Sequence, residues 1–137
     1  MKYNNSVILG VLGSIGIVLL IIFFMNTKTT HTKLSGVDFI QQYKNTPDAI
    51  LLDVRTEEEF ASGHIDTATN IDFQGQSFDS EIAKLDTTKP YFVYCRSGNR
   101  SGQAVAAMKA RGFTDIYELD GGLMSNENTI GLVTVEK

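Results

Sequence analysis

The longest hydrophobic stretch of the chain covers residues 7–25 and contains no charged side chain. A helix rises about 1.5 Å per residue, so this stretch is just long enough to cross a hydrocarbon core of about 30 Å. No polar stripe interrupts it, as one would in a buried helix of a soluble domain. The pattern predicts one transmembrane helix, which separates a tail at residues 1–6 from a polar, Thr-rich linker at residues 26–33.

A cleaved signal peptide is the alternative interpretation of the same stretch. Its apolar length exceeds that of a usual signal core, and no small-x-small cleavage site follows closely, which favours an uncleaved anchor. Lipoprotein processing is excluded because no cysteine lies nearby. Lys2 and the terminal amino group nearly balance Lys28 and Lys33 across the stretch, and the short amino-terminal tail favours a domain outside the cytoplasm. We expect a single-pass protein of the cell membrane that contacts lipid through residues 7–25.

Residues 34–137 alternate short apolar runs with helix-forming segments, and are long enough to fold as one domain. An alternation of strands and helices at this spacing is typical of an α/β fold, with a parallel sheet covered by helices on both faces. The predicted strands cover residues 49–54, 68–71, 91–94 and 116–119, and the predicted helices cover residues 36–45, 57–61, 79–85 and 101–111.

Two of these helices begin with a recognisable sequence signal. A hydroxyl side chain followed three residues later by an acidic one has the spacing of a helix capping box. The pairs with this spacing are Ser35–Asp38 and Thr56–Glu59. In the first helix, Val37, Ile40 and Tyr43 recur at helical spacing and predict its buried face.

The single cysteine, Cys95, lies between the strand at residues 91–94 and the helix at residues 101–111. Free backbone N–H groups and the positive end of the helix dipole meet at such a junction. Arg96 and Arg100 add positive charge, so the surroundings favour a thiolate and a bound anion. We therefore interpret Cys95 as a nucleophile or sulfur carrier rather than as a small buried packing residue.

Charge and composition narrow the choice of partners. Residues 34–137 contain 9 Lys and Arg against 16 Asp and Glu, which argues against nucleic acid as a partner. One cysteine cannot form an intramolecular disulfide. Cys95 and His64 do not have the spacing of metal ligands, and no cofactor motif is present, so we expect neither a metal nor a cofactor.

Two motifs resemble the single-domain rhodanese family of thiosulfate sulfurtransferases. The first runs from Leu52 to Ile65 and the second from Tyr94 to Ser101, with Gly121-Gly122 further along. The resemblance covers about residues 34–135 and implies a persulfide on Cys95, formed without a cofactor. It also implies that the donor or the persulfide is held by the loop residues Arg96, Ser97, Gly98, Asn99, Arg100 and Ser101.

The sequence departs from the family pattern at two places. Asp66-Thr67 stand where the family usually has Pro-Gly, and the usual tryptophan after the glycine pair is missing near Asn126. Related phosphatases carry an arginine six positions after the cysteine, whereas Arg100 lies five positions after Cys95. The shorter loop favours a sulfur atom over a phosphoryl group, and a phosphatase is disfavoured.

Charged residues of the first motif have a structural interpretation. We expect Asp53 and Arg55 to support the site as a partly buried charge pair at the end of a strand. Glu59 is interpreted as a helix-capping residue and His64 as a turn residue with a hydrogen-bonded ring. Arg100 is expected to hold the loop closed through backbone carbonyls or through Asp53.

The leading hypothesis is a sulfurtransferase. A small anionic donor such as thiosulfate would give its outer sulfur to Cys95, and a thiol, on a small molecule or a protein, or cyanide would accept it. The alternative is a membrane-tethered sulfur carrier or docking module with little turnover of its own, since a carrier needs the same cysteine and loop.

Overall fold

Five parallel strands form the centre of the computed structural model, which describes residues 28–131. Their order across the sheet is β1-β5-β4-β2-β3, and every neighbouring pair is parallel. The strands are β1 (Thr30–Leu34), β2 (Ile50–Asp53), β3 (Thr69–Asn70), β4 (Pro90–Tyr94) and β5 (Asp115–Leu119). Because all strands run the same way, the segments that follow β2, β4 and β5 meet at one edge of the sheet.

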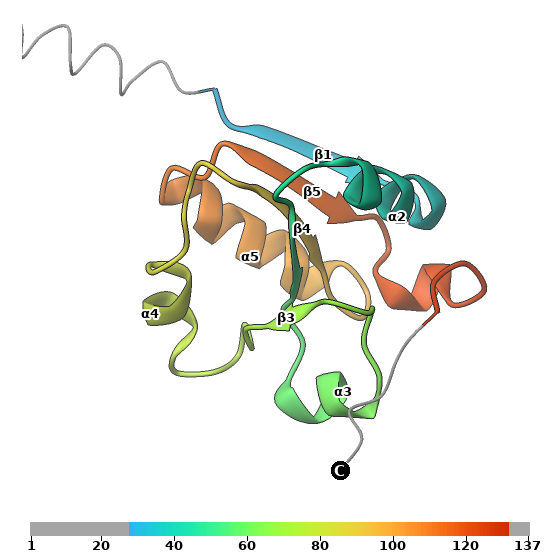
Figure 1. Cartoon of the computed structure of the whole chain (residues 1–137). Helices are drawn as coiled ribbons and strands as arrows, with labels where there is room; N and C mark the ends of the chain where they lie inside the picture. Colours follow the sequence, from blue (N-terminus) through green and yellow to red (C-terminus); the bar gives the residue numbers. More distant parts are fainter. Residues whose placement is uncertain (1–27, 132–137) are drawn as a thin grey trace, which may run out of the picture.

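Helices pack on both faces of this sheet, as predicted (Figure 1). They are α2 (Gly36–Asn45), α3 (Glu57–Ser62), α4 (Phe78–Ile82), α5 (Asn99–Ala110) and the short 3₁₀ helix η1 (Leu123–Asn126). On one face, Val93 of β4 packs in a core with Ile82 of α4 and Met108 of α5. On the other face, Phe92 of the same strand packs with Phe39 of α2 and Leu123 of η1.

Both predicted helix starts are confirmed. Ser35 caps α2 by accepting a hydrogen bond from the backbone N–H of Asp38. Thr56 and Glu59 form a reciprocal capping box at α3, in which each side chain accepts from the other residue's backbone N–H. Such signals are readable from sequence because all of their atoms lie within four residues.

The predicted linker at residues 26–33 is wrong in its second half, because Thr30–Leu34 form the edge strand β1. This strand pairs with β5 on one side only, and four of its five residues are exposed. An exposed edge strand needs no apolar residues, so its sequence looks like that of a linker.

Three details of the predicted helices also differ. In α2, Ile40 and Tyr43 of the predicted face pack against the core, but Val37 is 61% exposed and the fully buried side chain is Phe39. Helix α4 ends at Ile82 rather than Leu85, because the N–H of Leu85 bonds to the carbonyl of Ile82 in a tighter turn. Helix α5 begins at Asn99, two residues before the predicted start.

Between residues 28 and 131, no helix is both long and apolar enough to cross a bilayer. The predicted transmembrane segment at residues 7–25 and the tail at residues 1–6 lie outside the described residues.

Candidate active site

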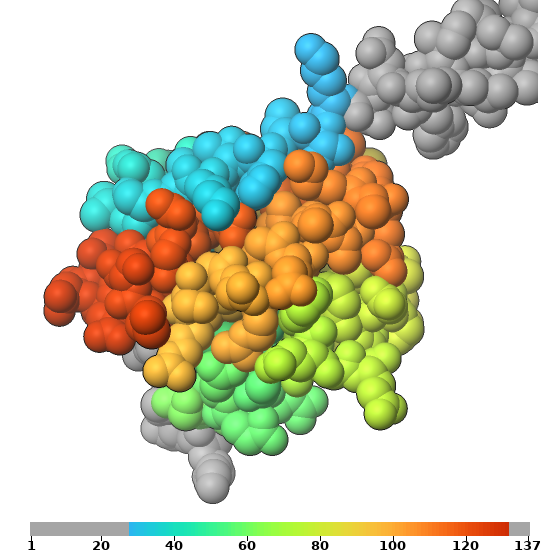
Figure 2. All heavy atoms as spheres, turned by 180° about the vertical axis from the view of Figure 1, so that it is seen from behind, coloured from blue at the N-terminus to red at the C-terminus, as the bar shows by residue number. Residues whose placement is uncertain are grey.

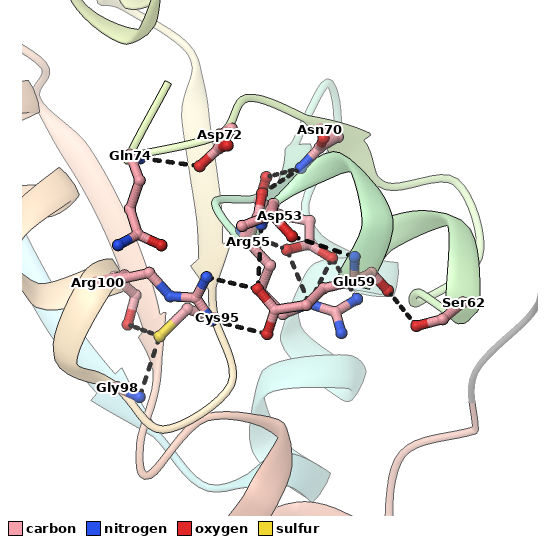
Figure 3. A network of polar contacts seen from close by, with 12 residues as sticks. Asp53, Arg55, Glu59, Ser62, Asn70, Asp72, Gln74, Cys95, Gly98 and Arg100 are labelled. Atoms are coloured by element: carbon pink, nitrogen blue, oxygen red, sulfur yellow. Dashed lines mark hydrogen bonds and ion pairs between the residues drawn. The ribbon is translucent and has the colours of Figure 1, made fainter. Parts of the chain in front are cut away.

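Cys95 lies directly after β4, and its sulfur faces Gly98 of the loop that leads into α5 (Figure 3). Its side chain is completely buried. The backbone N–H of Gly98 points at Sγ from 3.1 Å. Gly98 has a φ of 88°, a left-handed conformation that turns the loop back toward the sulfur and that residues with a Cβ avoid. The loop thus presents a backbone donor to the sulfur at the start of a 12-residue helix.

The carbonyl groups of the loop are held away from the sulfur by η1. The N–H of Leu123 donates to the Cys95 carbonyl at 3.0 Å, and the N–H of Met124 donates to the Arg96 carbonyl at 2.8 Å. Gly122 permits this approach, since a Cβ there would lie 2.6 Å from the Arg96 carbonyl oxygen. Because a trans peptide points its N–H opposite to its carbonyl, the N–H groups of these two peptides point away from η1.

Arg100 holds α3 against the loop, as Figure 3 shows. Its two terminal nitrogens bind the two carboxylate oxygens of Glu59 at 2.5 and 2.8 Å. The prediction that Arg100 binds Asp53 is therefore wrong, because Arg55 already binds that carboxylate. The side-chain hydrogen bond from Arg100 lowers the pKa of Glu59 to about 2. Glu59 is both a helix cap and an ionised partner of the active-site loop.

Asp53 and Arg55 form the predicted charge pair, and both are nearly fully buried. Arg55 donates to both carboxylate oxygens of Asp53 at 2.7 to 3.1 Å and to the Gly63 carbonyl at 2.6 Å. These bonds fix the segment that follows β2 to the end of α3. Neither side chain is bonded to Cys95. This supports the interpretation that the pair stabilises the structure around the site and takes no direct part in the chemistry.

Arg96, Ser97 and Asn99 are exposed on the outer side of the loop. Within the part of the chain that the structure describes, the Arg96 guanidinium forms no ion pair with a carboxylate. In the space-filling view, the gold segment that contains the loop lies between the red C-terminal segment and the green α3 segment (Figure 2). Arg96 is therefore open to solvent, whereas Arg100 is engaged within the fold.

Ser101 is buried and faces the sulfur from the first turn of α5. Its Oγ lies 3.5 Å from Cys95 Sγ and donates a hydrogen bond of 2.8 Å to the carboxylate of Glu118 on β5. Glu118 was not singled out in the sequence. No local signal marks it, because its contacts come from residues 17 or more positions away.

His64 has the predicted hydrogen-bonded ring, but it lies in an isolated β-bridge, and the turn is formed by Asp66 and Thr67. Its Nδ1 bonds to the Phe60 carbonyl at 2.9 Å, and its ring stacks on the Phe60 ring. A groove of about 590 Å³ lies nearby, between α2, the segment Ile65–Thr67 and the segment Thr129–Gly131, but it contains no residue of the Cys95 loop. The groove is therefore separate from the Cys95 loop.

Comparison with known proteins agrees with this geometry. Residues 37–128 match the family model of the rhodanese-like domain. The thiosulfate sulfurtransferase GlpE of Pseudomonas savastanoi is 42% identical over 74 residues, which are 54% of this chain and 68% of that protein. The GlpE of Pseudomonas syringae is 36% identical over 88 residues, 64% of this chain and 81% of that protein.

Solved structures give the same result. A rhodanese-related protein from Thermoplasma volcanium has a TM-score of 0.65 and 27% identity, over 76% of this chain and 99% of that one. A rhodanese from E. coli solved with anions has a TM-score of 0.52 and 29% identity, over 64% of this chain and 99% of that one. Together with the loop around Cys95, these matches show that the chain belongs to the rhodanese-like family.

Proposed function

We propose that the protein is a sulfurtransferase that carries sulfane sulfur on Cys95 from a small anionic donor such as thiosulfate to a thiol or cyanide. The observation that carries the proposal is the position of Cys95 at the end of β4, with the Gly98 N–H 3.1 Å from its sulfur. The relatives named thiosulfate sulfurtransferase support the choice of donor.

The reaction has two steps. The Cys95 thiolate attacks the outer sulfur of thiosulfate, a new S–S bond forms, and the old S–S bond breaks with its electron pair leaving on sulfite. The acceptor then attacks the outer sulfur of the persulfide, and the pair of the breaking bond returns to Cys95. Arg96 attracts the dianion and offsets its charge, while the loop N–H groups hold the bound sulfur.

The test is the thiosulfate:cyanide reaction with wild type and Cys95→Ser. The serine variant should lose turnover while its thermal unfolding stays close to that of wild type, because the side chains are similar in size. After thiosulfate alone, mass spectrometry of the wild type should show an increase of about 32 Da, one sulfur atom, on Cys95. Turnover by the serine variant would contradict the mechanism.

A sulfur carrier with little turnover uses the same first step, so the second step separates the two functions. Repeated turnovers with cyanide or with a small thiol support the enzyme. A stable persulfide that only a protein thiol discharges supports the carrier.

We also propose that residues 7–25 anchor the domain in the cell membrane, with the domain outside the cytoplasm. The uncharged stretch supports the anchor, and the short amino-terminal tail supports the orientation. Residues 26–29 lie between this stretch and β1, and four extended residues reach about 14 Å at most. The full chain should stay in carbonate-washed membranes while a chain that starts at Lys28 does not, and protease added outside right-side-out vesicles should digest the domain.

A further inference from the structure

Glu118 is a carboxylate inside the core, and the sulfurtransferase mechanism does not use it. It lies on β5 with 1% of its surface exposed, on the same sheet face as Ile116. Burying a carboxylate is costly unless partners satisfy it. An aliphatic side chain would fill the same place on a core strand without that cost. The carboxylate therefore points to a functional role rather than a packing role.

Side chains from the loop, α5 and β1 lie on the two sides of this carboxylate. Cys95 Sγ donates to Ser101 Oγ at 3.5 Å, and Ser101 Oγ donates to Glu118 Oε1 at 2.8 Å. On the far side, His31 Nε2 of β1 lies 2.9 Å from Glu118 Oε2, and Lys33 Nζ lies 3.8 Å from the same oxygen. A continuous chain of contacts therefore runs from the buried nucleophile to a partly exposed histidine on the edge strand.

The directions of these hydrogen bonds define a path for a proton from Cys95 to Glu118. The thiol points its proton at Ser101, and Ser101 points its own proton at the Glu118 carboxylate. If both protons move one step, the S–H bond breaks, Ser101 exchanges one proton for another, and an O–H bond forms on Glu118. The result is a Cys95 thiolate that accepts from Ser101, which accepts from a protonated Glu118, and no hydrogen bond is lost.

We propose that Glu118 holds the proton of Cys95 during sulfur transfer, with Ser101 as the bridge between them. This proposal rests on the sulfurtransferase function given above. The proton reaches Glu118 as the thiolate forms and attacks the donor, and it returns along the same path when the acceptor discharges the persulfide and regenerates the thiolate. Glu118 acts through Ser101 and is therefore a positioning residue, while His31 and Lys33 of β1 are the basic side chains that face it.

Alkylation of Cys95 by iodoacetamide tests the proposal without any sulfur transfer. The reagent is uncharged, and Cys95 is the only cysteine, so the rate reports reaction at this one site. Its rise with pH reports thiolate formation, and its plateau at high pH reports access to the buried sulfur. The assay uses the full-length chain in detergent over a wide range of pH. The matched control is Glu58→Gln, which removes the same charge from an exposed position on α3.

Glu118→Gln should slow alkylation at neutral pH by about tenfold or more, shift the rise in rate to higher pH, and leave the plateau at high pH unchanged. Ser101→Ala should have the same effect, and the double variant should be no slower than the slower single variant, since both changes break one path. Glu58→Gln should match wild type. Thermal unfolding of each variant verifies that it is folded. If Glu118→Gln does not fold, Ser101→Ala alone tests the proposal.

Faster alkylation in Glu118→Gln would overturn the proposal, because Glu118 would then act only as a negative charge that opposes the thiolate. An unchanged rate, or additive effects in the double variant, would overturn it as well. The assay also separates this proposal from the proposed function. A wild type that transfers no sulfur contradicts the sulfurtransferase, while its alkylation profile still decides the role of Glu118.

Discussion

The two loop arginines differ in what surrounds their guanidinium groups, and this difference assigns them different tasks. Arg96 is exposed and free of ion pairs within the described residues, whereas Arg100 binds both carboxylate oxygens of Glu59. An exposed cation attracts an anion from a distance, and salt screens that attraction. A bidentate pair fixes geometry, because both groups are held in one plane.

Arg96→Ala should therefore raise KM for thiosulfate, with a smaller effect on kcat, and should make kcat/KM less sensitive to salt. Arg100→Ala should lower kcat as well, since the loop loses its contact with α3. Steady-state kinetics at low and high ionic strength measure both effects. Purely KM-type effects from both substitutions would show that Arg100 serves the donor and not the loop.

A substitution of Glu59, the partner of Arg100, provides a control for this prediction. Glu59→Gln keeps the size of the side chain but removes the charge that holds Arg100. It should lower kcat in the same way as Arg100→Ala, and the double variant should lose little more. Additive losses would mean that the two residues act on sulfur transfer separately.

At the scale of elements, η1 acts as a clamp on the active-site loop. Its N–H groups hold two loop carbonyls, and Gly122 allows the two backbones to touch. Gly122 has a φ of 62° and a ψ of −164°, a conformation that almost only glycine adopts. A methyl group at this position would meet both backbone strain and the Arg96 carbonyl.

Gly122→Ala should lower the free energy of unfolding by at least about 3 kcal/mol and abolish sulfur transfer, because η1 must move away from the loop. Gly112→Ala is the matched control. Gly112 also has a positive φ, of 86°, but a Cβ there would meet no atom within 4 Å. It should cost about 1 kcal/mol from strain alone and leave activity intact. Urea unfolding and the thiosulfate:cyanide assay test both, and equal losses would exclude a clamp.

The elements that the sequence predicted are those whose signals are local. Capping at Ser35 and Thr56 involves atoms of neighbouring residues, and the buried strand β2 is a continuous apolar run. Strand β1 has no such signal, since its polar residues lie on an open edge. In α2 the pattern predicts the packing of Ile40 and Tyr43 but not that of Phe39, because the contact between Phe39 and Phe92 is set by β4 and not by the helix pattern.

In the candidate site, too, the features with local signals could be predicted and those set by distant residues could not. The nucleophile, the loop and the two arginines follow one another in the sequence, so their chemistry could be predicted from the order of residues. The partners of the loop could not, because Glu59 lies 41 residues from Arg100 and Glu118 lies 17 residues from Ser101. Only the sheet order, which puts β5 between β1 and β4, brings Glu118 between His31 and the active-site loop.

At the scale of the whole molecule, the lowered pKa of one carboxylate makes the free energy of unfolding depend on pH. Glu59 has a pKa of about 2 instead of the usual 4.5, primarily because of its hydrogen bond with Arg100. A carboxylate whose pKa is lowered by folding stabilises the folded state above its unfolded pKa. This contribution is lost as the pH falls from 4.5 toward 2, because the unfolded chain then takes up a proton that the folded chain still excludes.

The difference in the free energy of unfolding between wild type and Glu59→Gln should therefore be constant above about pH 5. It should shrink steadily below that value, as protonation of the unfolded wild type removes the advantage of the ion pair. Urea unfolding at a series of pH values measures it, with Glu58→Gln as the control of equal charge on the same helix. A difference that stayed constant down to pH 2, the folded pKa of Glu59, would contradict the ion pair, since a mere loss of packing does not depend on protonation.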